Sequence, residues 1–264
     1  MGHRTLSRLR ACRGQAMVET LVVLFVALLL LLGIVQFGLI YNAKITLNYA
    51  AFEAARAGAL NYADKRAIEY ALAVGLSPIY TSVDPADSSM DKVKAVQVAR
   101  DRLYEDEISN GRFACIQRIN PAPSHFAGNI HGIADNTGLF VGQRLIPNDH
   151  LRYRSALPKG SPPVSIQDAN LLKLRVTYCY PMYVPIIANT VKWVMGMRDT
   201  SVSRTLKAKP YEGWSAPAVG DFQAACYKAD EIDGTGYPRI PLVAQAIVRM
   251  QTPAKNDTFP EICD

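Results

Sequence analysis

Hydrophobic positions are most densely grouped near the N-terminus. Between residues 21 and 40 almost every residue is Leu, Val, Ile, Phe or Ala, and only two glycines and one glutamine interrupt the run. About 20 apolar residues are enough for an α-helix to cross a bilayer. The pattern therefore predicts a transmembrane helix over residues 20–41.

A helical pattern continues beyond the apolar run. Apolar residues recur at steps of three and four, and polar residues fall largely on other faces. We expect one continuous helix over residues 15–60 that begins in the membrane and ends in water. A cleaved secretory signal fits less well, because its apolar core usually spans only about 7 to 15 residues. The apolar face predicted outside the membrane consists of Ile45, Tyr49, Phe52, Ala55 and Ala59.

Shorter helices and turns follow the long helix. Residues 61–78 show the apolar spacing of a short helix, which Pro78 is expected to end. A second amphipathic helix is predicted over residues 91–111. Residues 120–165 are rich in Gly, Pro, Asn and Ser. This composition predicts an irregular region, with short strands near residues 138–146.

Strict alternation of apolar and polar residues predicts a strand that begins near residue 172. Residues 201–209 and 242–251 are expected to complete an antiparallel sheet, and residues 186–196 to form a short helix that covers it. The fold class is therefore α+β, with a body of short helices and an antiparallel sheet over residues 61–264 behind the long helix. The predicted inner face of the strand consists of Leu172, Leu174, Val176, Tyr178 and Tyr180.

The charge distribution orients the chain and argues against nucleic-acid binding. Four arginines and no acidic residue lie within residues 1–14, so the N-terminus is expected in the cytoplasm and the body in the periplasm. The formal net charge of the whole chain is +6. Much of this charge belongs to the N-terminal arginines, and the rest of the chain has no Lys/Arg-rich block. We therefore expect no nucleic-acid partner.

Four cysteines lie in the predicted periplasmic body. In an oxidising compartment an even set of this kind predicts two disulfides, and three connectivities are possible. Four reduced and buried thiols are the alternative. Zinc binding is not expected, because no C-x-x-C or Cys/His pair has ligand spacing. The disulfide candidates are Cys115, Cys179, Cys226 and Cys263.

The sequence offers only weak evidence for a catalytic or metal site. His125 and His131 lie six residues apart without an H-E-x-x-H motif, so loop histidines with ordinary hydrogen bonds are expected rather than a metal site. The acidic cluster of Asp230, Glu231 and Asp233 is expected to be a solvated turn. No G-x-S-x-G elbow or phosphate-binding loop occurs. We expect no enzyme, no catalytic residue, no metal and no cofactor.

One acidic residue stands at the start of the apolar run. A charged and unpaired Glu19 costs on the order of a few kcal/mol in a membrane segment. A basic leader that ends in Gly14, followed by four residues and this glutamate, resembles the N-terminus of a type IV prepilin. The resemblance implies cleavage by a prepilin peptidase between Gly14 and Gln15. Glu19 would then pair with the new amine of a neighbouring subunit and act as a docking charge. The alternative is a glutamate that only complements the helix dipole.

The stretch from residue 13 to residue 60 is similar to the TadE-like family of the tight-adherence (Tad) pilus system. The similarity lies in the "GQAMVE" start and in "AAFEAARAGA" at residues 50–59, with weaker likeness at residues 171–186 and 239–253. One position departs from the small major pilins of that system, since Thr20 stands where they usually have tyrosine. A major filament subunit is therefore not expected.

The resemblance implies a minor pilin or pseudopilin that serves in assembly of a Tad-type pilus and in surface attachment. Its leader would be residues 1–14, and the processed chain would be a single-pass inner-membrane protein. Implied partners are the prepilin peptidase, other pilin-like subunits and the inner-membrane assembly platform. Small residues would allow close helix packing, namely Gly33, Gly38 and the alanines of residues 50–59. The alternatives are a membrane-anchored periplasmic enzyme with a site within residues 115–165, and an uncleaved bitopic scaffold protein.

Overall fold

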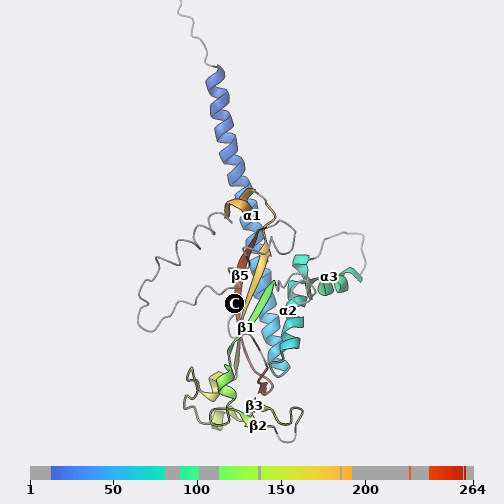
Figure 1. Cartoon of the computed structure of the whole chain (residues 1–264), viewed down its shortest axis with the longest axis vertical. Helices are drawn as coiled ribbons and strands as arrows, with labels where there is room; N and C mark the ends of the chain where they lie inside the picture. The colour runs from blue at the N-terminus through green and yellow to red at the C-terminus, as the bar shows by residue number, and fades with distance from the viewer. Residues whose placement is uncertain are drawn as a thin grey trace, which may run out of the picture.

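The structure is a computed structural model, and it describes residues 13–80, 90–100, 113–135, 138–184, 186–191, 226, 238–257 and 259. One long helix carries the body on its C-terminal half, and its N-terminal half extends away from the body (Figure 1). The helices are α1 (Arg13–Leu60), α2 (Lys65–Tyr80), α3 (Met90–Arg100) and α4 (Ile166–Ala169). The strands are β1 (Ala114–Asn120), β2 (Ile133–Ala134), β3 (Arg144–Ile146), β4 (Leu171–Pro181), β5 (Arg239–Arg249) and β6 (Ala254–Lys255). The α+β class expected from the sequence is confirmed.

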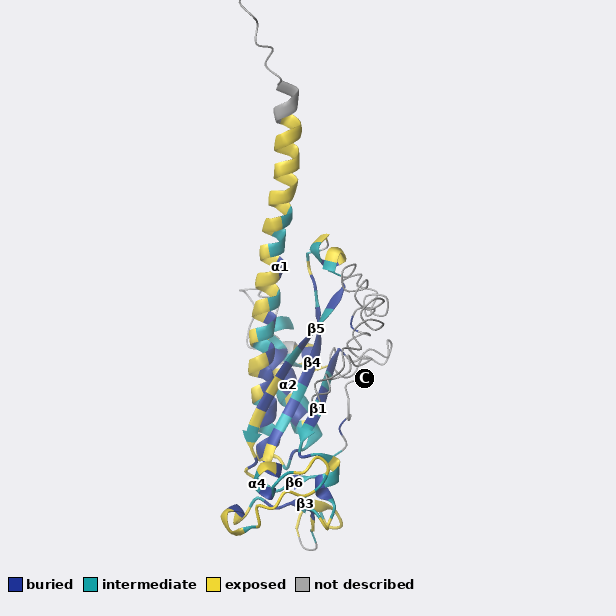
Figure 2. Ribbon diagram, turned by 90° about the vertical axis from the view of Figure 1, so that its left-hand side faces the viewer, coloured by how far each residue is buried: buried dark blue, intermediate teal, exposed yellow. Residues whose placement is uncertain are grey.

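Helix α1 contains 48 residues without a break. Among the described residues it is the one helix that is long and apolar enough to cross a membrane. Residues 17–28 are all exposed, as Figure 2 shows in yellow. The helix ends where Tyr62 and Ala63 adopt positive φ angles of 57° each. The N–H of Ala63 then donates to the carbonyl of Gly58 at 2.8 Å, which closes the last turn.

Helix α2 begins after Asp64. The Asp64 carboxylate accepts a hydrogen bond from the Ala67 N–H at 3.1 Å and binds the ammonium group of Lys255. Burial alone would raise the pKa of Asp64, but these hydrogen bonds outweigh it and hold the pKa below its ordinary value. This carboxylate therefore both starts α2 and ties it to strand β6.

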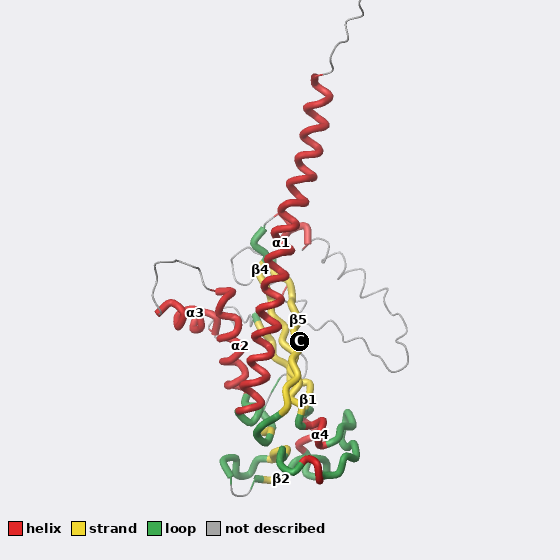
Figure 3. The backbone as a smooth tube through the Cα atoms, turned by 180° about the vertical axis from the view of Figure 1, so that it is seen from behind, coloured by secondary structure: helices red, strands yellow, loops and turns green. Residues whose placement is uncertain are grey.

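Helix α2 packs directly on α1, and Figure 3 shows the two side by side. The contact is close because the facing residues are small. A Cβ atom added at Gly75 would lie 2.6 Å from the Cα and 2.7 Å from the Cβ of Ala50. Only a glycine on α2 allows the two backbones to approach this closely.

The prediction that Pro78 ends this helix was wrong, because α2 continues to Tyr80. Proline has no N–H to donate to the carbonyl four residues earlier. That carbonyl, of Val74, instead accepts a hydrogen bond from the Ser77 hydroxyl at 2.8 Å. A side-chain donor thus replaces the missing backbone donor and lets the last turn form.

The main sheet is antiparallel with the order β1-β4-β5. Central strand β4 pairs with both neighbours, since Val176 lies opposite Ile116 of β1 and Ala244 of β5. The inner face predicted for β4 is confirmed, because all five of its residues are buried. Strand β1 was not predicted from the sequence. The predicted strand at residues 201–209 lies outside the described residues.

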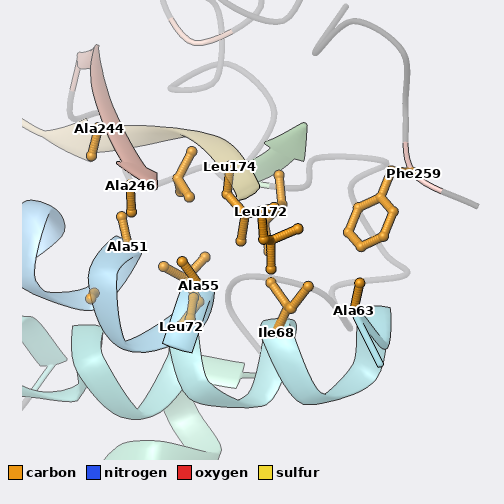
Figure 4. Close-up of a cluster of buried hydrophobic side chains, with 14 of the residues drawn as sticks. Ala51, Ala55, Ala63, Ile68, Leu72, Leu172, Leu174, Ala244, Ala246 and Phe259 are labelled. Carbon is orange, nitrogen blue, oxygen red and sulfur yellow. The ribbon is translucent and has the colours of Figure 1, made fainter. Parts of the chain in front are cut away.

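The core lies between this sheet and the helix pair. Leu172 and Leu174 of β4 and Ala246 of β5 face Ala51 of α1 and Leu72 of α2 (Figure 4). The alanines of α1 let the helix lie flat against the sheet, and the larger side chains of α2 and β4 fill the remaining space.

A second, smaller sheet of order β2-β3-β6 lies at the end of the body farthest from the protruding half of α1 (Figures 1 and 2). The short strand predicted near residues 138–146 corresponds to β3. The helix predicted over residues 186–196 is described over residues 186–191. It lies beyond the end of the main sheet that is opposite the smaller sheet, and it does not cover the main sheet as expected (Figure 2).

Candidate subunit-docking surface on the N-terminal helix

The C-terminal half of α1 has two apolar faces, and the body covers one of them. The covered face consists mainly of alanine, with exposed fractions of 3% or less. Small side chains bring the helix axis close to α2 and to the sheet. The residues of this face are Ala43, Leu47, Ala50, Ala51, Ala54, Ala55 and Ala59.

The other face carries large apolar side chains that stay about half or more exposed. They follow one another at steps of three or four residues, so they form a single line along the helix. We call this line the α1 stripe; it consists of Phe37 (69% exposed), Tyr41 (69%), Ile45 (50%), Tyr49 (59%) and Phe52 (48%). The continuous yellow edge of α1 in Figure 2 includes this face.

The body divides the predicted apolar face, which consists of Ile45, Tyr49, Phe52, Ala55 and Ala59, into an exposed and a buried part. Ile45 and Phe52 are exposed, whereas Ala55 and Ala59 are buried. The chain after β5 folds over the end of α1, where the N–H of Gln251 donates to the Ala59 carbonyl at 3.0 Å. The body therefore covers the last part of a face that it leaves open higher on the helix.

The alanines of residues 50–59 are also corrected. They were expected to allow a partner helix to approach, but five of them are buried against the chain's own body. Gly33 and Gly38 differ from them, because a Cβ atom added at either position would meet no atom within 4 Å. Close approach to another helix is thus open at the two glycines and closed at the alanines.

The predicted processing and docking residues lie at the free end of α1. The helix begins at Arg13, so Gly14 and Gln15 belong to its first turn. Glu19 follows one turn later and is exposed. This arrangement places the predicted docking charge on the same helix as the α1 stripe, separated from it by most of the apolar run.

Two of the candidate cysteines form a disulfide, Cys179 of β4 with Cys226, and their Cα atoms are 5.4 Å apart. Both pack with Phe113 in a small buried cluster. Arg239 lies over the Phe113 ring at 3.9 Å and donates to the Cys179 carbonyl at 3.2 Å. Cys115 is also disulfide-bonded, and Cys263 lies outside the described residues.

The two loop histidines are buried and hydrogen-bonded to backbone. The Nε2 atoms of His125 and His131 lie 2.8 Å and 2.9 Å from the carbonyls of Pro162 and Val164. Nδ1 of His125 accepts a hydrogen bond from the Ala122 N–H at 3.0 Å, so His125 carries its proton on Nε2. Both nitrogens of that ring are therefore engaged in holding the loop together.

Groups of three or more His, Cys, Asp or Glu side chains that could hold a metal ion do not occur among the described residues. The acidic cluster at residues 230–233 lies outside them. The described part of the chain therefore offers its most distinctive exposed chemistry on α1, and this chemistry is apolar.

The comparison with protein families bears on the same helix. The family of TadE-like proteins matches residues 14–56, from the glycine of the predicted cleavage site to a point one turn before the end of α1. The N-terminal segment of this chain is TadE-like. No curated protein and no solved structure matches the chain significantly.

The TadE-like segment includes Gly14, Glu19 and the whole α1 stripe, and the body lies almost entirely outside it. The family implies association with pilus components and with the membrane. Sequence reasoning found Ile45, Tyr49 and Phe52 but missed Phe37 and Tyr41 as members of the stripe. These two lie in or next to the apolar run, where nearly every residue is apolar and periodicity gives no signal.

Proposed function

We propose that this protein is a TadE-like minor pilin or pseudopilin that serves in the assembly of a Tad-type pilus. In this proposal α1 anchors the chain in the inner membrane, with the N-terminus in the cytoplasm and the body in the periplasm. A prepilin peptidase removes residues 1–14. The protein acts through contacts with other pilin-like subunits and with the assembly platform, and it carries out no catalysis.

The α1 stripe is the observation that carries this proposal. Its last three members, Ile45, Tyr49 and Phe52, lie beyond the predicted membrane span, where an isolated chain would expose them to water. Full burial of a large apolar side chain is worth roughly 1.5–3 kcal/mol. A row of three at helical spacing is therefore a strong drive for contact with another helix, and such rows are typical anchors of helix recognition.

Glu19 supports the same proposal at the other end of α1. Cleavage after Gly14 creates an α-amino cation at the cytoplasmic boundary of the membrane helix, close to Glu19. A carboxylate of a neighbouring subunit would be attracted to it more strongly at this partly desolvated boundary than in bulk water. The charge pair would fix the axial register of two helices, and the α1 stripe would supply most of the contact area. Surface attachment of the cell would follow from the assembled pilus.

Crosslinking in the native host tests the α1 stripe. A photo-reactive phenylalanine analogue replaces Tyr49 of the stripe or, as a matched control, Tyr70 of α2. Both tyrosines are 59% exposed, so they differ in location and not in accessibility. We expect crosslinks to pilin-like subunits from position 49 and several-fold fewer from position 70. Equal yields at both positions, or crosslinks only to unrelated proteins, would count against the proposal.

Intact mass of the membrane-extracted protein tests processing. We expect a chain that begins at Gln15, and a full-length chain for Gly14→Val with loss of pilus assembly. A wild-type chain that still begins at Met1 would favour the uncleaved scaffold. Retained assembly together with lost function after substitution of His125 would favour the anchored enzyme, provided that the variant remains folded.

A further inference from the structure

The glutamine in the apolar run of α1 is buried against a segment far away in the sequence. Gln36 is 1% exposed, and its Oε1 atom accepts a hydrogen bond from the backbone N–H of Val184 at 3.0 Å. Val184 belongs to the segment between the end of β4 and the short helix at residues 186–191. This segment therefore sits at the height of residue 36 on α1.

The height of residue 36 relative to the bilayer follows from helix geometry. The apolar run ends at Ile40, four residues later, and each residue advances a helix by 1.5 Å. Gln36 thus lies about 6 Å inside the end of the hydrocarbon layer if the run spans it. Lys44, the first charged residue after the run, lies roughly 12 Å further along and binds the carbonyl of Val243 in β5.

Shifting the membrane span toward the N-terminus does not avoid this conclusion. If the hydrocarbon layer ended before Gln36, the remaining run from residue 21 would cover only about 22 Å of the roughly 30 Å required. The missing length would have to come from residues before 21, and Glu19 would then lie within the hydrocarbon. A buried charge costs more than a hydrogen-bonded backbone segment, so the span that contains Gln36 is favoured.

The segment is chemically suited to this depth. Its backbone N–H at Val184 is already satisfied, as a group in the hydrocarbon layer requires. Tyr183 is 48% exposed and Ile186 is 50% exposed. Tyrosines are enriched at the membrane surface, where the ring meets lipid and the hydroxyl meets water. Tyr41, at the end of the apolar run on α1, is placed at a similar height.

We propose that residues 183–184 and 186–191 form a second membrane contact, which inserts shallowly into the lipid of the periplasmic leaflet beside α1. The inference rests on the membrane anchoring that is part of the proposed function, and it is independent of cleavage and of pilus assembly. The body is then fixed to the bilayer at two points, so it stands at a defined angle to the membrane instead of swinging on one helix.

Depth-dependent quenching tests this contact. A fluorescent amino acid replaces Ile186 in the full-length protein, which is reconstituted in vesicles that contain lipids brominated near the headgroup or near the end of the chain. Phe37 on α1 is the positive control for membrane insertion. Leu157, which is 68% exposed, is the control for water exposure. We expect shallow bromine to quench position 186 about as strongly as position 37 and several-fold more than position 157.

The outcomes distinguish the membrane anchor of α1 from the second membrane contact. Quenching at position 37 without quenching at position 186 overturns the second contact and leaves the anchor in place. Loss of quenching at both positions overturns the membrane anchor itself, and the second contact with it. If a water-soluble quencher reaches position 186 but bromine does not, the segment is exposed to the periplasm. If neither reaches it while position 37 is quenched, a protein partner covers it. Each of these last two results also overturns the proposal.

Discussion

Gly75→Ala is expected to destabilise the body, although alanine is the better helix former. The added methyl group would lie 2.6 Å from the Cα of Ala50, far inside normal contact distance. The neighbour is backbone of α1 and cannot rotate away. The two helices must therefore move apart, and the alanine and leucine contacts around them loosen at the same time.

The two opposing effects differ in size. Replacing glycine by alanine inside a helix favours folding by about 1 kcal/mol. Overpacking of a well-packed contact costs about 1–3 kcal/mol, and a clash with backbone belongs at the upper end. The net loss is then about 2 kcal/mol, which lowers the melting temperature by roughly 4–8 °C for a domain of this size.

Thermal unfolding of the full-length protein in detergent measures this effect. Near-ultraviolet circular dichroism reports on the body, because its tyrosines are ordered there. Gly38→Ala is the matched control, since no atom lies within 4 Å of the added methyl group. The control should leave the melting temperature of the body unchanged or raise it slightly, because alanine is the better helix former. A higher or unchanged melting temperature for Gly75→Ala would refute the close helix contact.

Three further substitutions test other contacts. Asp64→Asn should make stability depend less on pH in the acid range. Burial raises the Asp64 pKa, but the hydrogen bonds from Lys255, Ala67 and Arg66 and the charge of Lys255 together outweigh it and lower the pKa, so wild type loses stability as the pH falls from about 5 towards 3. Urea unfolding at both pH values measures this. Cys226→Ala removes the disulfide to Cys179, whose sequence separation is 47, and should lower the free energy of unfolding in urea by about 2–4 kcal/mol. Reductant should then have no further effect through this bond. Tyr80→Phe removes the 2.7 Å contact with the Tyr178 hydroxyl and should cost about 1–2 kcal/mol by thermal unfolding, whereas an unchanged melting temperature would mean that the buried hydroxyl finds another partner.

The local sequence pattern was sufficient to predict elements whose structure depends on the residues of one segment alone. Twenty apolar residues predict a membrane helix because no other segment of the chain needs to be considered. The alternation from Leu172 to Tyr180 predicts a strand with one buried face for the same reason. The predictions of a docking charge and a cleavage site also rest on local pattern, since Gly14 and Glu19 occur at a fixed spacing before the apolar run.

Local pattern failed where a distant segment supplies the partner. Pro78 was expected to end its helix, but the Ser77 hydroxyl replaces the backbone N–H donor that proline lacks. Strand β1 is too irregular to stand out in the sequence, and it forms because β4 offers an open edge. The helix at residues 186–191 was expected on the sheet, yet the hydrogen bond to Gln36 places the segment before it beside α1.

The candidate docking surface shows the same division. The sequence by itself determined that Ile45, Tyr49 and Phe52 share one face of a helix, because helical periodicity is a property of the segment alone. Only the tertiary structure decided that the alanine face meets the body and that this aromatic face stays open. The choice depends on α2 and β4 lying close to α1, and small side chains permit that approach where large ones do not.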